Sequence, residues 1–304
     1  MRELLKNIYY SDLGYKIFSP LRKIYFKLKI YFPSEIFFVV NKFKKRHGYK
    51  LNLDNPKTFN EKIAWLKLNY RKPIMSSLAD KYEVRSFVDR KIGKEYLIPL
   101  INVFHKMDEI NFNKLPGSFV LKAAHGSSWN IVSPNKQKLD IRLSKMKLND
   151  WFNTNYYALS REWVYKEIQP KFVCEEFIKD KNGLSPKDYK IFCFDGKPKY
   201  IQIDLDRFSG HSRVFYDLNW QKLPFGLEYP TSEIGINKPD GFNEMIRIAK
   251  VLSQGFPFSR IDLFNLEGKI YFGEITFFPG DGSEVFEPAE WDLILGKDII
   301  LDKI

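Results

Sequence analysis

The chain has 304 residues and a mass of 36.1 kDa, enough for two or three domains, each with a buried core. Its apolar fraction of 44% and charged fraction of 28% exclude wholesale disorder, and no apolar run of roughly 18 residues predicts a membrane-spanning helix. The opening residues lead into no apolar signal region, so we expect a cytoplasmic protein. Cys174 and Cys193 are too few for a cysteine metal site and are expected to be buried, reduced thiols.

The net charge of +12 is concentrated at one end of the chain. Residues 1–50 hold twelve Lys or Arg against three acids, whereas the other 254 residues hold 37 against 34. Aromatic residues interleave with these lysines, as in Tyr25–Phe32. This pattern argues against nucleic acid as a partner and suits peripheral contact with an anionic membrane, at the inner face of a bacterial cytoplasmic membrane. An amphipathic segment packed on the body, with its lysines in solvent, is the alternative, and both remain open.

Helix signals follow the basic segment. Thr58 and Glu61 have the spacing of a capping box, and the apolar residues after them predict a helix over residues 59–70. A second N-terminal signal at Asp80 predicts a helix that ends before Gly93.

The rest of the chain alternates strand and helix patterns. Strand pairs separated by helices predict an α+β fold, not a doubly wound parallel sheet. The predicted elements are a strand over 119–124, helices near 140–152 and 159–168, a strand over 172–178, hairpins over 189–203 and 213–223, a helix over 242–253, and a strand pair over 260–264 and 269–276.

A lysine and a turn-rich loop follow the first of these strands. Lys122 lies near the strand end, and Gly126, Ser127 and Ser128 follow it closely. Backbone N–H groups and hydroxyls of such a loop can bind a phosphate, to which the lysine adds charge. Taken alone, a plain β-turn is the favoured interpretation.

The final strand pair carries three oxygen-bearing side chains. Glu274 and Thr276 share one face of their strand, and an antiparallel return brings them near Asp262. Magnesium suits this set because it is commonly held by one or two carboxylates and substrate phosphates. A structural ion pair between Arg260 and a carboxylate is the alternative. Under the magnesium hypothesis, neutralising either carboxylate should abolish turnover while stability holds or rises.

Two further segments are candidates for ligand contacts. The strand end Glu175–Ile178 could form an apolar wall for adenine, although an ordinary amphipathic strand has the same pattern. The cluster over residues 204–213 is rich in groups that bind anionic oxygens, although a solvated loop is an equal alternative. Its candidate anion-binding residues are Arg207, His211 and Arg213.

Taken jointly, the order of these features resembles the ATP-grasp superfamily, and in particular its TupA-like branch of surface-polysaccharide enzymes. The resemblance covers roughly residues 50–296. It is carried by Thr58–Trp65, Ala79–Tyr82, Phe119–Lys122 with His125–Ser127, Glu175–Ile178, and Arg260–Asp262 with Glu274–Gly280.

The resemblance implies ATP and magnesium as cofactors and a role for each motif residue. The implied phosphate-binding residues are Lys81, Lys122, His125, Gly126, Ser127 and Ser128; the adenine hinge is Glu175, Glu176, Phe177 and Ile178, with Asp188 at the ribose. Asp262 and Glu274 become magnesium ligands, and Arg260 steadies the transferred phosphoryl group. Thr276 stands where the superfamily usually has a ligating Asn, and the phosphate loop lacks a later glycine.

The resemblance also implies an architecture in which two α+β lobes built on antiparallel sheets hold the nucleotide. We expect a basic helical segment over residues 1–50, with membrane docking as one of its two interpretations. A helical region over 51–115, a small lobe over 116–178 and a large lobe over 179–304 are expected to follow.

The implied function is an ATP- and Mg-dependent carboxylate–amine ligase that acts through an acylphosphate. Its substrates would be an amino acid or peptide and a uronic acid of a bacterial capsule or lipopolysaccharide. Arg207, His211 and Arg213 would be the candidates for contact with the acceptor carboxylate or the γ-phosphate. A kinase on the same nucleotide site remains open. The alternative is a glycosyltransferase in which Asp204-x-Asp206 binds a nucleotide sugar through a metal, and a non-catalytic membrane-docked assembly factor is a third class.

Overall fold

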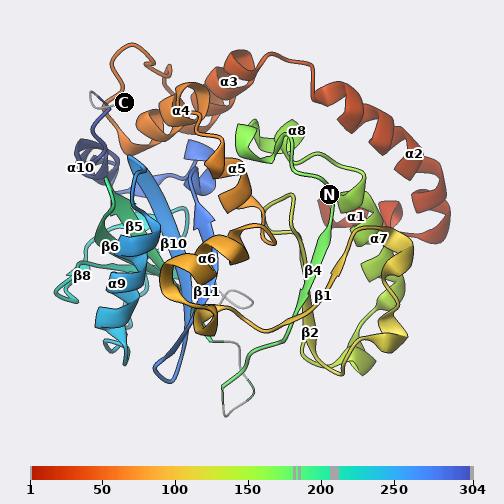
Figure 1. Cartoon of the computed structure of the whole chain (residues 1–304). Helices are drawn as coiled ribbons and strands as arrows, with labels where there is room; N and C mark the ends of the chain where they lie inside the picture. Colours follow the sequence, from red (N-terminus) through yellow and green to blue (C-terminus); the bar gives the residue numbers. More distant parts are fainter. Residues whose placement is uncertain (1, 181–182, 184–185, 206–211, 302–304) are drawn as a thin grey trace. The chain divides into compact units, whose positions relative to one another are not determined.

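The computed structural model describes residues 2–180, 183, 186–205 and 212–301, which fall into two compact units (Figure 1). Unit 1 takes residues up to 35, residues 73–84 and residues 99–177. Unit 2 takes residues 36–72, 85–98 and those from 178 onward. Both units combine helices with antiparallel strands, so the prediction of an α+β protein is confirmed.

Unit 1 is built on a four-stranded antiparallel sheet with the strand order β1-β4-β2-β3. Its core packs Phe119 and Leu121 of the sheet against Trp129 and Leu148. The strands are β1 Leu100–Phe104, β2 Phe119–Ala123, β3 Asn130–Ser133 and β4 Phe172–Glu175.

The described residues of unit 1 form five α-helices. They are α1 Arg2–Tyr9, α2 Asp12–Lys29, α5 Ile74–Ala79, α7 Ile141–Phe152 and α8 Tyr157–Ser160, with 3-10 turns at Met107–Glu109, Phe112–Lys114, Lys136–Lys138 and Trp163–Tyr165. The predicted helix over 159–168 is wrong. Arg161 takes a left-handed conformation with φ 59°, which ends α8 and leaves only a short turn after it.

A buried carboxylate joins the N-terminal helices to α7. Asp150 accepts hydrogen bonds from the hydroxyls of Tyr9, Tyr10 and Tyr15 at 3.0, 3.2 and 3.1 Å. Arg22 of α2 lies 3.6 Å from the same carboxylate. Burial raises the pKa of Asp150, although Arg22 and the tyrosine hydroxyls lower it. The basic N-terminal segment is therefore helical, as predicted, and α1 and α2 are fixed to unit 1.

Unit 2 is built on a six-stranded antiparallel sheet with the order β11-β10-β5-β6-β7-β8 and a two-stranded sheet of β9 and β12. The predicted hairpins and final strand pair are confirmed. The strands are β5 Lys187–Phe194, β6 Lys197–Leu205, β7 Ser212–Tyr216, β8 Lys222–Leu223, β9 Gly226–Leu227, β10 Phe258–Leu266, β11 Lys269–Thr276 and β12 Phe286–Glu287.

The helices of unit 2 are α3 Glu35–His47, α4 Phe59–Asn69, α6 Val84–Ile92, α9 Phe242–Leu252 and α10 Glu290–Asp298, with 3-10 turns at Lys94–Tyr96 and Pro279–Gly282. The capping box predicted for α4 is present, because Thr58 accepts from the N–H of Glu61 and Glu61 accepts from the N–H of Thr58. Phe59, at the start of α4, packs against the rings of Phe192, Phe258 and Phe286 in the core.

Both cysteines are buried and reduced, as predicted, and burial raises the pKa of each thiol to about 12. No helix among the described residues combines the length and hydropathy that crossing a membrane requires.

Candidate functional site

The β10–β11 hairpin positions the predicted metal-binding carboxylates. Asp262 of β10 lies directly opposite Glu274 of β11, and Arg260 lies opposite Thr276. Gly273 allows this close pairing, since a Cβ at that position would lie 2.9 Å from the carbonyl oxygen of Asp262. The hairpin therefore brings together the three side chains that the strand periodicity predicted.

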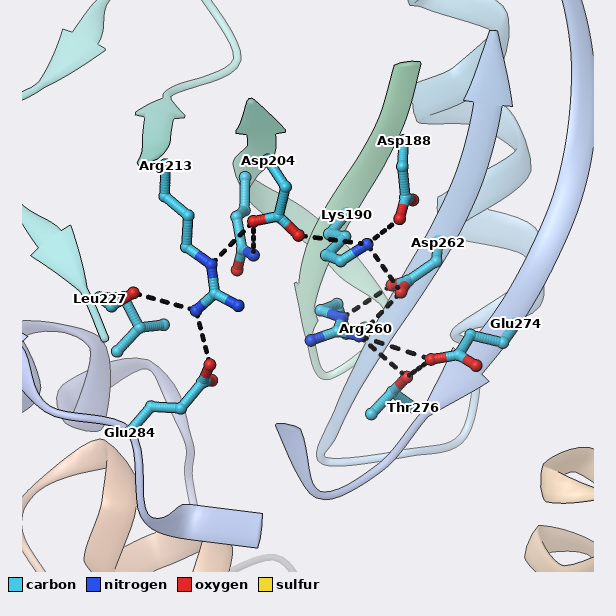
Figure 2. A network of polar contacts seen from close by, with 11 residues as sticks. Asp188, Lys190, Asp204, Arg213, Leu227, Arg260, Asp262, Glu274, Thr276 and Glu284 are labelled. Carbon is cyan, nitrogen blue, oxygen red and sulfur yellow. Dashed lines mark hydrogen bonds and ion pairs between the residues drawn. The ribbon is translucent and has the colours of Figure 1, made fainter. Parts of the chain in front are cut away.

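Arg260 binds the carboxylates of this hairpin (Figure 2). Its Nε and Nη2 donate to the two oxygens of Asp262, each at 2.7 Å, and Nη2 also donates to Thr276 Oγ1 at 3.3 Å. Nη2 lies 3.5 Å from Glu274 Oε1, to which Thr276 Oγ1 donates at 2.9 Å. The ion pair that the sequence left as the alternative is thus present in the structure.

A second cation, Lys190 of β5, also contacts Asp262. Lys190 Nζ is 3.4 Å from Asp262 and 3.8 Å from Asp204, and it also contacts Asp188 (Figure 2). Burial raises the pKa of Asp262, while Arg260 and Lys190 oppose this rise. Asp262 is therefore a buried carboxylate compensated by two cations, and Asp188 is bound to the same lysine.

These residues fit magnesium only with help from a ligand. Among the described residues, no group of three or more His, Cys, Asp or Glu side chains could hold a metal ion. Asp262 and Glu274, with the hydroxyl of Thr276, are hard oxygen donors, and Glu274 is one-third exposed. Magnesium is commonly bound by two such carboxylates together with substrate phosphates. The donor set therefore fits magnesium delivered with a nucleotide.

Arg213 of β7 is fixed within unit 2. Its Nε donates to Asp204 at 2.7 Å, and its Nη1 donates to Glu284 at 2.5 Å and to the carbonyl of Leu227 at 2.9 Å (Figure 2). The neighbouring candidates Arg207 and His211, and Asp206 of the glycosyltransferase alternative, lie outside the described residues.

In unit 1, the predicted phosphate residues lie at the end of β2 and in the loop after it. Lys122 Nζ is 2.6 Å from Glu175, on the adjacent strand β4. Lys81 Nζ donates to the carbonyl of Gly126 at 2.5 Å. The structure thus brings Lys81 and the loop together, and it places Lys122 against the first residue of the predicted hinge.

The loop between β2 and β3 is shaped by buried side chains. His125 is buried, and one ring nitrogen lies 2.9 Å from the carbonyl of Trp151. Burial lowers the pKa of His125. A Cβ on Gly126 would lie 2.5 Å from the Trp129 ring, and Ser128 adopts φ 60°, with Ser127 between them. His125 therefore supports the loop from inside the protein.

The predicted hinge begins at the end of β4. The Glu176 N–H donates to the carbonyl of Pro99 at 3.0 Å, so it is already occupied by protein. Phe177 is half-buried and ends unit 1, whereas Ile178, also half-buried, begins unit 2.

The TupA-like ATPgrasp family model matches residues 61–300 of the chain. The chain belongs to this family. Helices α1, α2 and α3 lie before the match. The resemblance stated from the motifs is thereby confirmed, and so is the ATP-grasp fold class.

Several solved structures of ATP-grasp enzymes resemble the TupA-like chain at low sequence identity. D-alanine–D-alanine ligase from Helicobacter pylori is 14% identical, over 80% of this chain and 67% of that chain, with a TM-score of 0.41. The Bacillus anthracis enzyme complexed with ATP is 15% identical over 73% of this chain, with a TM-score of 0.39. The ATP-grasp ligase PsnB, complexed with a minimal precursor, Mg and ADP, is 12% identical over 72%, with a TM-score of 0.38. The chain spans 65% of the Bacillus ligase and 58% of PsnB. A comparison with curated proteins gave no match.

Sequence reasoning on this TupA-like chain missed two lysines. Lys190 follows Asp188 by two residues on β5, so strand periodicity alone could have placed both on one face. Lys171 precedes β4 and binds Asp80 and Glu83 at 3.0 and 2.9 Å. Burial lowers the pKa of Lys171, but these two acids raise it further, so the net shift is upward. No local pattern connects Lys171 with residues about ninety positions earlier.

Proposed function

We propose that this TupA-like protein is an ATP- and Mg-dependent carboxylate–amine ligase. Family membership supports the use of ATP. The observation that carries the proposal is the hairpin of unit 2, where Arg260 lies between two carboxylates suited to magnesium. The proposal assigns Asp262 and Glu274 to the metal, which when bound would neutralise phosphate charge.

The proposed reaction has two steps. An oxygen of the substrate carboxylate forms a bond to the γ-phosphorus of ATP, the bond from that phosphorus to the β–γ bridging oxygen breaks, and ADP leaves. The amine nitrogen then bonds to the carbonyl carbon of the acylphosphate, phosphate leaves, and the nitrogen loses a proton. Both steps depend mainly on positioning and on stabilising negative charge.

The chain's own cations have separate proposed roles. Lys81 and Lys122 bind ATP phosphates, and Arg260 stabilises charge on the transferred phosphoryl group. Glu175–Ile178 receive adenine and Asp188 the ribose, and residues 116–178 and 179–304 form the two lobes. Because Arg260 is held by Asp262 at 2.7 Å, its guanidinium is oriented before the substrate arrives.

The proposed substrates are an amino acid or peptide and a uronic acid of a bacterial capsule or lipopolysaccharide. Arg207, His211 and Arg213 are the proposed contacts of the acceptor carboxylate or the γ-phosphate. An acceptor of this kind suits peripheral contact of residues 1–50 with an anionic membrane, which we include in the proposal.

Hydroxylamine trapping tests the chemistry. The protein is incubated with ATP, magnesium and a uronic-acid glycan or an amino acid, without the natural amine, and we expect a hydroxamate together with ADP. Glu274→Gln should give neither product, whereas Glu244→Gln, whose side chain is equally exposed, should give both.

Three outcomes would contradict the ligase. ATP consumption that yields a stable sugar phosphate would identify a kinase. A melting temperature raised by a nucleotide sugar but not by ATP would identify a glycosyltransferase. A melting temperature that neither nucleotide changes would favour a non-catalytic assembly factor.

A further inference from the structure

Helix α2 presents an apolar stripe to solvent. Its members lie three or four residues apart, which places them on one helical face. Each is between 50% and 70% exposed, although residues of this kind normally face the core. We call them the α2 stripe: Leu13, Ile17, Leu21, Ile24 and Leu28.

The opposite face of α2 is the one held by the protein. Tyr15 donates to Asp150 of α7 at 3.1 Å, Arg22 donates to Thr154 at 2.9 Å, and Ser19 is buried. Helix α2 contacts both α7 and α8, and Figure 1 shows it beside α7. An ordinary surface helix turns its apolar face inward, so α2 has the reverse arrangement.

The C-terminal end of α2 is fixed as well. Arg161 is fully buried and donates to the carbonyls of Lys29 and Pro33 at 2.6 and 3.0 Å. These contacts satisfy carbonyl groups at and just beyond the end of the helix. The stripe is therefore carried on a helix anchored along its inner face and at its end.

Positive charge flanks the stripe. Lys16, Lys23 and Lys27 are spaced seven and four residues apart, so they follow one side of the same helix. The one acid of α2, Asp12, is paired with Arg142 of α7 at 2.6 Å. An anionic surface would thus meet lysines beside the apolar stripe and little opposing charge.

Exposed aromatic rings accompany the stripe and the lysines. Phe18 and Tyr25 of α2 are exposed, and Tyr31 and Phe32 after it are more than 70% exposed. Apolar side chains flanked by lysines and rings are typical of helices that lie in the headgroup layer of a bilayer, where lysines reach the phosphates.

We propose that the α2 stripe docks on the surface of an anionic phospholipid bilayer. The helix lies parallel to the surface, with the stripe among the upper acyl chains and Lys16, Lys23 and Lys27 at the headgroup phosphates. This inference rests on the membrane contact proposed for residues 1–50 and narrows it to one face. It is independent of the ligase chemistry, because vesicle binding and ATP turnover are measured separately.

Vesicle sedimentation of the full chain tests the proposal. Vesicles of phosphatidylcholine mixed with phosphatidylglycerol are compared with phosphatidylcholine alone. Each lysine near an anionic surface is worth roughly a fivefold change in the partition coefficient, so replacing all three stripe-side lysines with Gln should weaken binding about a hundredfold. Replacing Leu21 and Ile24 with Ser should weaken it at least about tenfold. Salt should weaken binding by the wild-type protein.

Two control variants test whether vesicle binding depends on the α2 stripe or only on the total charge and hydrophobicity of the protein surface. One control replaces three exposed lysines of unit 2, Lys197, Lys250 and Lys269, with Gln. The other replaces two exposed apolar residues of unit 2, Ile234 and Leu293, with Ser. Both controls should bind mixed vesicles like the wild type. Because the changed side chains are exposed, apart from the half-buried Lys23, circular dichroism should show every variant folded.

Three results would overturn the proposal. The first is equal binding by the stripe variants and their controls, and the second is equal binding to vesicles with and without phosphatidylglycerol. The third is a wild-type protein that binds no vesicles and is a dimer in light scattering, combined with a Leu21→Ser, Ile24→Ser variant that is a monomer. In that case the stripe is an interface between two copies of the chain.

Discussion

Replacing Asp262 with Asn removes a charge from the buried network of unit 2. Asp262 is 4% exposed, accepts two hydrogen bonds from Arg260 at 2.7 Å, and lies 3.4 Å from Lys190 Nζ. Breaking a buried ion pair costs about 3–5 kcal/mol, because a charge is left uncompensated. Part of this cost is offset, because burial raises the pKa of Asp262 and thus disfavours the charge that Asn removes. Asn also keeps one acceptor for Arg260, and Glu274 remains 3.5 Å away, so we expect a net loss of about 2 kcal/mol.

This expectation reverses the one drawn from the sequence, where relief of carboxylate repulsion predicted unchanged or higher stability. Glu274→Gln behaves differently, since the side chain is 34% exposed and its ion pair is screened by water. We expect it to cost less than about 1 kcal/mol. Glu244→Gln is the matched control, because Glu244 is also 34% exposed and also pairs with an arginine.

Urea unfolding without nucleotide or magnesium measures the stability of the three variants, and ADP release measures their turnover. Asp262→Asn and Glu274→Gln should both lose turnover, although only the first loses much stability. An Asp262→Asn protein as stable as the wild type would refute the ion-pair argument. Wild-type turnover in folded Glu274→Gln would refute the metal assignment.

Three further predictions concern unit 1. Burial raises the pKa of Asp150 in the folded protein above its value of about 3.9 in the unfolded chain. The folded state therefore favours the protonated carboxyl group, and the stability that this group contributes is complete below the unfolded pKa and is lost as pH rises through the folded pKa. The stability of the wild type relative to Asp150→Asn should therefore fall as pH rises, and urea midpoints that show the opposite slope would contradict this. Gly126→Ala should cost about 1–3 kcal/mol in thermal unfolding, because its Cβ would lie 2.5 Å from the Trp129 ring. Lys122→Met should weaken ATP binding at least about tenfold in a titration, whereas Lys114→Met, at an exposed position, should not.

Elements governed by local chemistry could be predicted from the sequence. The capping box at Thr58 and the final hairpin depend on residues within a few positions of one another, and both are present. The hairpin explains why Asp262 lies near Glu274, but their direct pairing could not be predicted, because a bulge between Asp262 and Leu263 shifts the register by one residue at Gly273.

Features that depend on distant segments could not be predicted. The contact of Lys190 with Asp262 requires β5 to pair with β10, which no local pattern specifies. The helix expected over 159–168 does not form, because the Arg161 side chain donates hydrogen bonds to the carbonyls of Lys29 and Pro33, more than 120 residues earlier in the chain. Tertiary contacts here override helical periodicity.

The route of the chain has a consequence for the order in which the protein can form during synthesis. The chain passes from one unit to the other after residues 35, 72, 84, 98 and 177. All strands of unit 1 have been synthesised once Phe177 has been made. In contrast, the ring of Phe59 packs against Phe192, Phe258 and Phe286, which are synthesised much later. On the ribosome, the start of α4 with Phe59 must therefore remain uncovered until almost the whole chain has emerged, whereas Ala64 of α4 can pack at once against Val39 and Phe43 of α3. The exposed start of α4 is where a chaperone would first be needed.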